Sequence, residues 1–197
     1  MIETVKQTGS HKAGKLYEKH FSHSMTISIH PFNVRKDTLF IHEWVNQDYA
    51  KRFWQMDGRT INELKKVYRH ISTCHFAQSF MARINYNRIC QLDLYHAPDD
   101  EVSLHYNAQP GDYGIHVLMA PRQQRVPGLS VCVLQTFLEY FFSFPDIERI
   151  IGEPDAENHR ANQLVQKLGF RFMKTISMSY KTANLYTCTR NDFINQP

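Results

Sequence analysis

Cysteine is scarce in this chain: Cys74, Cys90, Cys132 and Cys188 are the four in 197 residues, and no two lie close together. Small domains that depend on disulfides or on structural zinc carry cysteines at short spacings, so neither framework is predicted here. No secretory leader is recognisable ahead of the first cysteine. We therefore expect a reducing, cytoplasmic location.

Long apolar runs are also lacking. The most apolar stretch, from about Val131 to Phe144, is interrupted by Gln135, Thr136 and Glu139. It is shorter than the roughly 20 apolar residues that a membrane-spanning helix requires. A membrane is therefore not an expected partner.

A large excess of one charge is missing as well. Twenty-three Lys and Arg against 19 Asp and Glu leave a formal charge of +4, and the basic residues are scattered singly or in pairs. Nucleic-acid-binding proteins usually gather them into a stripe or run, so no nucleic-acid partner is predicted. A mild positive field still favours a small polyanionic ligand.

Apolar material, in contrast, is ample. Hydrophobic residues make up 42% of the chain and aromatic residues 13%. A chain of this length buries roughly 70% of the surface that it exposes when unfolded, which excludes intrinsic disorder. We expect an irregular arm over residues 1–24, because they are polar and mixed, followed by a single domain over residues 25–197.

Residue periodicity gives the order of elements within that domain. Asp37 is the expected N-cap of a first helix, Thr60 and Glu63 form a capping box, and Asn158 is the expected cap of a late helix. The predicted elements are a strand at 25–30, helices at 37–44, from 48 and at 61–71, strands at 74–84, 88–95 and 113–120, a helix at 128–143, a strand at 147–152, a helix at 158–169, and strands at 170–179 and 180–188.

The stretch Arg125-Val-Pro-Gly128-Leu-Ser130 joins a predicted buried strand to a long predicted helix. Glycine lets a ligand approach the backbone closely, and the first turn of a helix presents free N–H groups that suit a pyrophosphate. Pro-Gly before a helix is also ordinary turn chemistry. The loop alone therefore leaves both interpretations open.

A second stretch favours the phosphate interpretation. Asn158-His-Arg-Ala161 opens a predicted helix that ends in Gly169-Phe170. The two motifs together resemble the GNAT superfamily of acyl-CoA-dependent N-acyltransferases. The resemblance implies an α/β fold with a mixed central sheet splayed between two parallel strands and flanked by helices. It also implies an acyl-CoA co-substrate.

Further residues resemble the GNAT branch that acylates hydroxylamine nitrogens in hydroxamate siderophore biosynthesis. They are Trp44, the segment 49–56, Gly114-Ile-His116 and Glu153-Pro-Asp155. The resemblance implies transfer of an acetyl or succinyl group from CoA to an N-hydroxylated diamine or amino acid, a small-molecule substrate. Aminoglycoside 6′-N-acetyltransferases share much of the pattern, and a non-catalytic acyl-CoA-binding protein is a further alternative. Monomer and homodimer both remain open.

By this resemblance His116 and Asp155 are the predicted catalytic pair. Imidazole titrates near neutral pH, and a carboxylate nearby can orient it or hold the substrate. Direct transfer in a ternary complex is expected, because no cysteine lies beside a base to form an acyl-enzyme. The residues also allow structural roles, with Asp155 capping the next helix and His116 as a satisfied core residue.

The resemblance also assigns binding roles. The predicted acyl-CoA contacts are Met119, Arg125, Gly128, Leu129, Ser130 and Asn158. Trp54 and Trp44 are predicted to line the substrate pocket, or else to be core residues of the helical layer.

Two positions depart from the family pattern. Ser130 takes the place of a Gly or Ala in the phosphate loop, and Val165 stands where many members carry a tyrosine that protonates the departing thiolate. Tyr180 could supply that proton, or none is needed, because a thiolate is a good leaving group. No metal is expected, since His20-x-x-His23 and His42-Glu43 are better explained as solvated histidines than as zinc ligands.

Overall fold

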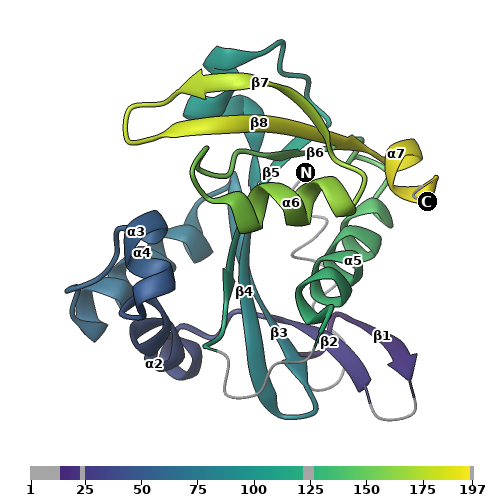
Figure 1. Ribbon diagram of the computed structural model, residues 1–197. Coiled ribbons are helices and arrows are strands. Elements are labelled where there is room, and N and C mark those ends of the chain that lie inside the picture. The colour runs from purple at the N-terminus through teal and green to yellow at the C-terminus, as the bar shows by residue number, and fades with distance from the viewer. Residues whose placement is uncertain (1–13, 23–24, 122–126, 196–197) are drawn as a thin grey trace. The chain divides into compact units, whose positions relative to one another are not determined.

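The computed structural model describes residues 14–22, 25–121 and 127–195. Their strands form a mixed sheet, hydrogen-bonded in the order β1-β2-β3-β4-β5-β6-β8-β7 (Figure 1). Strands β5 and β6 run parallel, and the pairs β1–β2, β2–β3, β6–β8 and β7–β8 are antiparallel. The predicted α/β fold is therefore confirmed. No helix within the described ranges combines the length and apolarity that crossing a membrane requires.

The chain folds as two compact units. The first holds the described residues up to Asp93 together with Val117–Thr136, and the second holds Leu94–His116 and Phe137 onward. Three elements contribute residues to both units: β4 (Asn87–His96), β5 (Asp112–Met119) and α5 (Leu129–Phe142).

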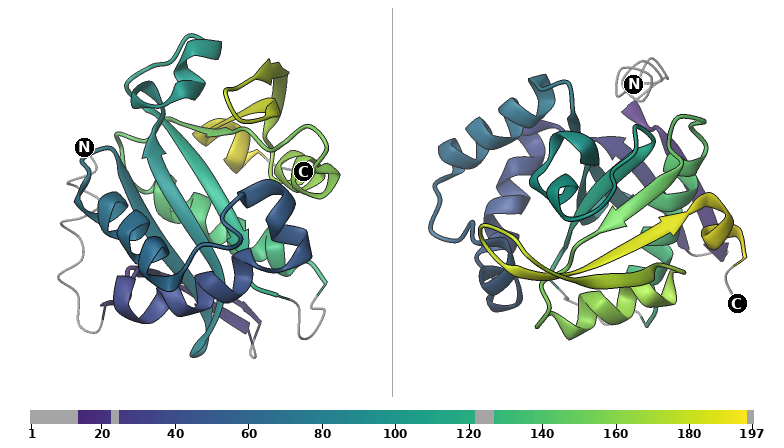
Figure 2. Two further views of the ribbon diagram at one scale, coloured as in Figure 1. Left: turned by 90° about the vertical axis from the view of Figure 1, so that its left-hand side faces the viewer. Right: turned by 90° about the horizontal axis from the view of Figure 1, so that it is seen from above.

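The first unit consists of the N-terminal strands and three helices. They are β1 (Tyr17–Ser22), β2 (Met25–Pro31), α2 (Val34–Val45), α3 (Asp48–Trp54), α4 (Ile61–Thr73) and β3 (Ala77–Ile84). Helices α2 and α4 lie side by side, and α4 packs against β3 (Figures 1 and 2). Their shared core consists of Ile41, Trp44, Val45, Ala50, Leu64, Tyr68, Met81 and Leu118. The helix predicted at 61–71 thus supplies two members of this core, Leu64 and Tyr68.

The predicted capping box of α4 is present. The Thr60 hydroxyl accepts from the Glu63 amide at 3.3 Å, and Glu63 Oε2 accepts from the Thr60 amide at 2.7 Å. Replacing Thr60 with alanine is expected to lower the free energy of unfolding by about 1 kcal/mol, because one amide of the first turn loses its acceptor. Urea denaturation tests this, with Ser72→Ala at the far end of α4 as the control. An unchanged midpoint for Thr60→Ala would contradict it.

The second unit carries the C-terminal half of the sheet. Its further elements are the short 3₁₀ helices η3 (Ala97–Asp99) and η4 (Glu101–His105), then β6 (Arg149–Gly152), α6 (His159–Lys167), β7 (Arg171–Ser177), β8 (Thr182–Thr189) and α7 (Arg190–Ile194). Helix α6 lies against β6 and β8 (Figures 1 and 2). Val165 Cγ1 lies 3.9 Å from the position that a Cβ would take at Gly152, and Gln166 donates to the Tyr186 hydroxyl at 3.3 Å.

Two expectations near the N-terminus are wrong. Tyr17–Ser22, placed in the irregular arm, form the edge strand β1 paired with β2. Burial alternates along this strand, but the sequence does not show the alternation, because both faces of the strand carry polar side chains. Asp37 does not cap α2, which begins at Val34 and is capped by Asn33. Asp37 is instead buried, with Oδ1 accepting from Arg88 Nε at 2.6 Å. The rest of the predicted arm, residues 1–13 and 23–24, lies outside the described residues.

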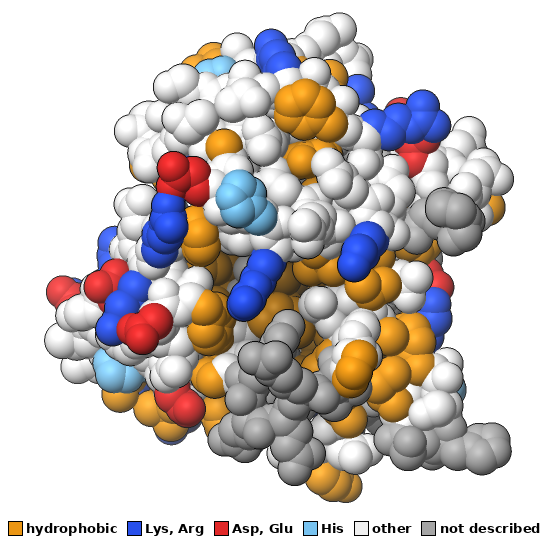
Figure 3. All heavy atoms as spheres, viewed as in Figure 1, with side chains coloured by type: hydrophobic (Ala, Val, Ile, Leu, Met, Phe, Trp, Pro, Cys, Tyr) orange, Lys and Arg blue, Asp and Glu red, His pale blue; other side chains and the backbone are white. Residues whose placement is uncertain are grey.

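Basic side chains do not merge on the face drawn in Figure 3. Lys and Arg appear there as separate groups with apolar and uncharged surface between them. This agrees with the scattered basic residues of the sequence.

Candidate active site

The candidate site lies where the parallel pairing of β5 and β6 ends. The paired residues are Asp112↔Arg149, Tyr113↔Ile150 and Gly114↔Ile151. His116 and Glu153 are separated by 37 positions, the same separation as Asp112 and Arg149. They therefore continue the register of the strands two residues beyond the last pair. Residues two apart on a strand share a face, so the register itself brings these two side chains together.

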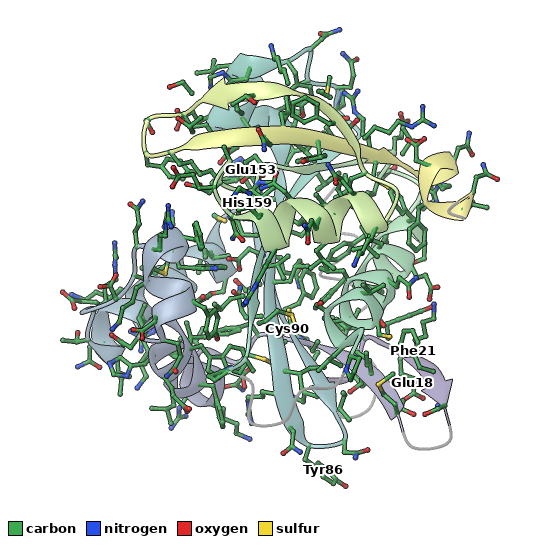
Figure 4. All side chains as sticks on the ribbon, in the orientation of Figure 1. Glu18, Phe21, Tyr86, Cys90, Glu153 and His159 are labelled. Carbon is green, nitrogen blue, oxygen red and sulfur yellow. The ribbon has the colours of Figure 1, made fainter. Side chains whose placement is uncertain are left out.

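His116 and Glu153 are joined by a hydrogen bond. The distance from His116 Nε2 to Glu153 Oε1 is 2.8 Å. The His116 side chain is 39% exposed, whereas that of Glu153 is 2% exposed. His116 can thus meet a ligand while Glu153 is held inside the protein. Glu153 is labelled in Figure 4.

Lys181 completes the surroundings of Glu153. Its Nζ donates to the Glu153 carbonyl oxygen at 2.5 Å and lies 3.6 Å from Oε1. Burial by itself raises the pKa of the Glu153 carboxyl, but the charge of His116, its hydrogen bond and the charge of Lys181 lower that pKa to about 2. Glu153 is therefore an ionised carboxylate at neutral pH, and it accepts from Nε2 rather than donating.

Tyr95 packs over this pair. Its ring centroid lies 4.8 Å from that of His116, with the planes tilted by 33°. A Cβ added to Gly114 would lie only 1.9 Å from Tyr95 Cζ, so the ring passes directly across the Gly114 backbone. Burial first, and the Glu153 carboxylate second, raise the pKa of the Tyr95 phenol, which therefore stays protonated. Gly114 thus makes room for the ring that supports His116.

Asp155, the predicted catalytic partner, forms its hydrogen bonds with residues that follow it closely in the chain. Its Oδ1 accepts from the Glu157 amide at 2.8 Å, and its carbonyl oxygen accepts from Asn162 Nδ2 at 2.9 Å. It also forms an isolated antiparallel bridge with Ala183. The side chain therefore shapes the turn that leads into α6, close to the capping role that the sequence left open. Its catalytic role stays a prediction.

The residues predicted to hold acyl-CoA are only partly described, and Arg125 lies outside the described residues. Gly128 has a φ of +76°, and no atom of the described residues lies within 4 Å of the position that a Cβ would take there. Leu129 and Ser130 follow in the first turn of α5 and are partly exposed. A phosphate group fits such a backbone. The Met119 carbonyl oxygen accepts from the Tyr49 hydroxyl at 2.6 Å.

Of the two roles predicted for Asn158, helix cap and acyl-CoA contact, the structure shows the cap. Its Oδ1 accepts from the Ala161 amide at 3.1 Å, which confirms the predicted N-cap of α6.

The two tryptophans predicted to line the substrate site differ in burial. Trp44 is 2% exposed within the core of the first unit, whereas Trp54 is partly buried and packs against that core. Of the two, Trp54 has more surface left for a substrate.

No acid for the departing thiolate is evident among the described residues. Val165 is 8% exposed and packs in the core. Burial, with the carboxylates of Glu153 and Asp100 nearby, raises the pKa of Tyr180, which makes its phenol a weaker acid.

Within the part of the chain that the structure describes, no group of three or more His, Cys, Asp or Glu side chains is placed to hold a metal.

Sequence reasoning missed Glu153, Lys181 and Tyr95 as members of the site. A usable signal was present for Glu153. Had the parallel strands been aligned residue by residue, the register would have placed it opposite His116. No comparable signal exists for Lys181, which immediately precedes β8, or for Tyr95, which lies in β4.

Comparison with known proteins agrees with this architecture. Residues 33–178 match the model of the acetyltransferase (GNAT) domain. The chain is 23% identical over 185 residues to an N-hydroxyputrescine acetyltransferase of Acinetobacter baumannii, covering 94% of this chain and 88% of the relative. It is 23% identical over 154 residues to an N(6)-hydroxylysine O-acetyltransferase of Escherichia coli, covering 78% of this chain and 49% of the relative.

Solved structures share the fold. An uncharacterised protein of Bacillus halodurans superposes with a TM-score of 0.85 at 22% identity, covering 94% of this chain and 95% of the other. The aminoglycoside acetyltransferase AAC(6′)-Ib, in complex with paromomycin and acetyl-CoA, superposes with a TM-score of 0.77 at 21% identity, covering 86% and 96%. With the family model matching most of its length, the chain belongs to the GNAT acetyltransferase family and is an acyltransferase.

Proposed function

We propose that this acyltransferase transfers an acetyl or succinyl group from CoA to the hydroxylamine nitrogen of an N-hydroxylated diamine or amino acid. The product is a hydroxamate, the iron-chelating group of hydroxamate siderophores. The observation that carries the proposal is His116, an imidazole with 39% of its side chain exposed at the end of the β5–β6 pairing. The names of the A. baumannii and E. coli relatives, which specify hydroxyputrescine and hydroxylysine, support the acceptor class.

An imidazole suits this acceptor for a chemical reason. The oxygen of a hydroxylamine withdraws electrons from the nitrogen, so that nitrogen is far less basic than an alkylamine and is largely unprotonated at neutral pH. Its lone pair attacks the thioester carbonyl, the C–S bond breaks, and the N–H proton must leave. His116 takes that proton, since a weak base is sufficient. The CoA thiolate leaves as the anion and takes a proton from solvent.

A substrate panel tests the proposal. Release of CoA from acetyl-CoA or succinyl-CoA is measured at neutral pH with N-hydroxyputrescine, N-hydroxycadaverine and N6-hydroxylysine. Putrescine, cadaverine and lysine are the matched controls that lack the hydroxyl oxygen. We expect kcat/KM for at least one hydroxylated amine to exceed that of its parent amine by more than about 100-fold, because the parent nitrogen is almost fully protonated at pH 7.

Kanamycin belongs in the same panel. Turnover of kanamycin without turnover of any hydroxylated amine would overturn the proposal in favour of an aminoglycoside acceptor. Binding of acetyl-CoA without turnover of any acceptor would favour a non-catalytic acyl-CoA-binding protein.

A further inference from the structure

We infer that Glu153, rather than Asp155, is the carboxylate that orients His116 and stabilises its protonated form during acyl transfer. Glu153 is a positioning residue, because it acts through His116 and is itself almost fully buried. The inference rests on the proposed function only in taking His116 as the base.

Geometry is the first argument. The Glu153 carboxylate is 2.8 Å from His116 Nε2, and the register of β5 and β6, continued two residues beyond their last pair, places these two residues opposite each other. A carboxylate that only accepts hydrogen bonds makes Nε2 the N–H nitrogen of the neutral ring, so the lone pair resides on Nδ1. Glu153 thereby selects which ring nitrogen accepts the substrate proton.

The second argument is that Glu153 has a cationic neighbour besides His116. Lys181 Nζ lies 3.6 Å from Oε1. This ammonium favours the ionised carboxylate also while His116 is neutral, so the new imidazolium forms directly beside a negative charge. Tyr95 from β4 and Tyr180 next to Lys181 are the other titratable groups near this carboxylate, and both phenols stay protonated.

The third argument is that the two candidate carboxylates differ in their partners. Glu153 is hydrogen-bonded to His116, and the buried Tyr95 phenol also helps to lower the pKa of its carboxyl. Asp155, in contrast, is already used by the turn before α6.

Every bond and proton of the transfer step is accounted for. The substrate nitrogen forms its bond to the acyl carbon, the C–S bond breaks, and the N–H proton moves to Nδ1 of His116. Nε2 keeps its hydrogen and its bond to Glu153 throughout, so the pair becomes imidazolium and carboxylate. The proton later returns to solvent, which restores the neutral ring.

The test compares two carboxylates at opposite ends of β6. Glu153→Gln removes the charge but keeps the shape of the side chain, and Glu148→Gln removes an exposed carboxylate at the start of the strand. In Glu153→Gln we expect kcat to fall about 10- to 100-fold. The acidic limb of the kcat/KM profile should move to lower pH by about one unit or more, because the imidazolium loses its counter-charge. The KM for acetyl-CoA should stay unchanged, and Glu148→Gln should match the wild type.

Two further variants keep the outcome decisive. Lys181→Met combined with Glu153→Gln removes both charges, so no buried charge is left without its partner. The acidic limb should still move to lower pH, but by less than in Glu153→Gln, because loss of the Lys181 cation favours the imidazolium. Asp155→Asn retains an oxygen acceptor for the turn and should leave the acidic limb in place. A shift of that limb in Asp155→Asn but not in Glu153→Gln would overturn the inference.

A measurement without substrate separates this inference from the proposed function. The histidine rings are labelled with ¹⁵N, and His116 is assigned by the signals that vanish in His116→Gln. Its titration midpoint should move to lower pH in Glu153→Gln and not in Glu148→Gln. An unchanged midpoint refutes the role of Glu153. Failure of every hydroxylated amine as substrate refutes only the proposed function.

Discussion

Replacing His116 with glutamine is expected to lower kcat for the hydroxylated amine at least about 100-fold, with little change in the KM for acetyl-CoA. A positioned general base contributes typically 10²- to 10⁴-fold, and glutamine has no group that accepts a proton near neutral pH. Glutamine is the informative replacement because its amide N–H can still donate to Glu153, which would otherwise be a buried charge without a donor. Steady-state kinetics with varied acetyl-CoA and varied acceptor measures both constants.

The control is His70→Gln, which changes an exposed histidine in the last turn of α4. It should match the wild type in both constants. A fall in kcat of less than about 10-fold for His116→Gln, in a protein with an unchanged melting temperature, would contradict the base role. A large rise in the KM for acetyl-CoA instead would assign His116 to binding.

Introducing alanine at Gly114 is expected to be the most disruptive of the small substitutions in β5. The new Cβ would lie 1.9 Å from Tyr95 Cζ, far inside contact distance, and Tyr95 is 3% exposed and has no room to retreat. We expect a loss of at least about 2 kcal/mol in the free energy of unfolding, as for other overpacked cores. Activity should fall as well, because the displaced ring packs on His116.

Gly152 provides the matched control in the neighbouring strand. A Cβ there would meet Phe170 at 3.6 Å, which is ordinary van der Waals contact. Gly152→Ala should therefore destabilise by less than about 1 kcal/mol in the same urea series. Combining Gly114→Ala with Tyr95→Leu should recover part of the stability lost by Gly114→Ala. Equal effects at the two glycines would show that the Tyr95 contact is not the cause.

Local sequence patterns predicted much of the fold because their physical causes are local. The Thr60–Glu63 capping box and the Asn158 cap each depend on residues within one helical turn, and both are present in the structure. The misplaced cap at Asp37 shows the limit of such reasoning. Asp37 has the residue type of an N-cap, but its carboxylate accepts from Arg88, 51 positions away, and from the amide of Asn33, the residue that caps the helix.

The site was predicted less completely for a related reason. The resemblance identified His116 and the Glu153–Asp155 segment, but it could not tell which carboxylate faces the imidazole. That choice depends on the register between β5 and β6, which are joined through α5 and are far apart along the chain. Tyr95 comes from β4 and Lys181 from the position before β8, so only the folded sheet brings them to Glu153.

The shared register of His116 and Glu153 means that backbone alignment, and not only side-chain identity, is a requirement of the chemistry. A slip of β6 along β5 by one residue would keep every side chain named above, yet it would turn Glu153 to the opposite face of the sheet. Deletions or insertions within 112–116 or 149–153 are therefore as damaging to this site as loss of the histidine itself.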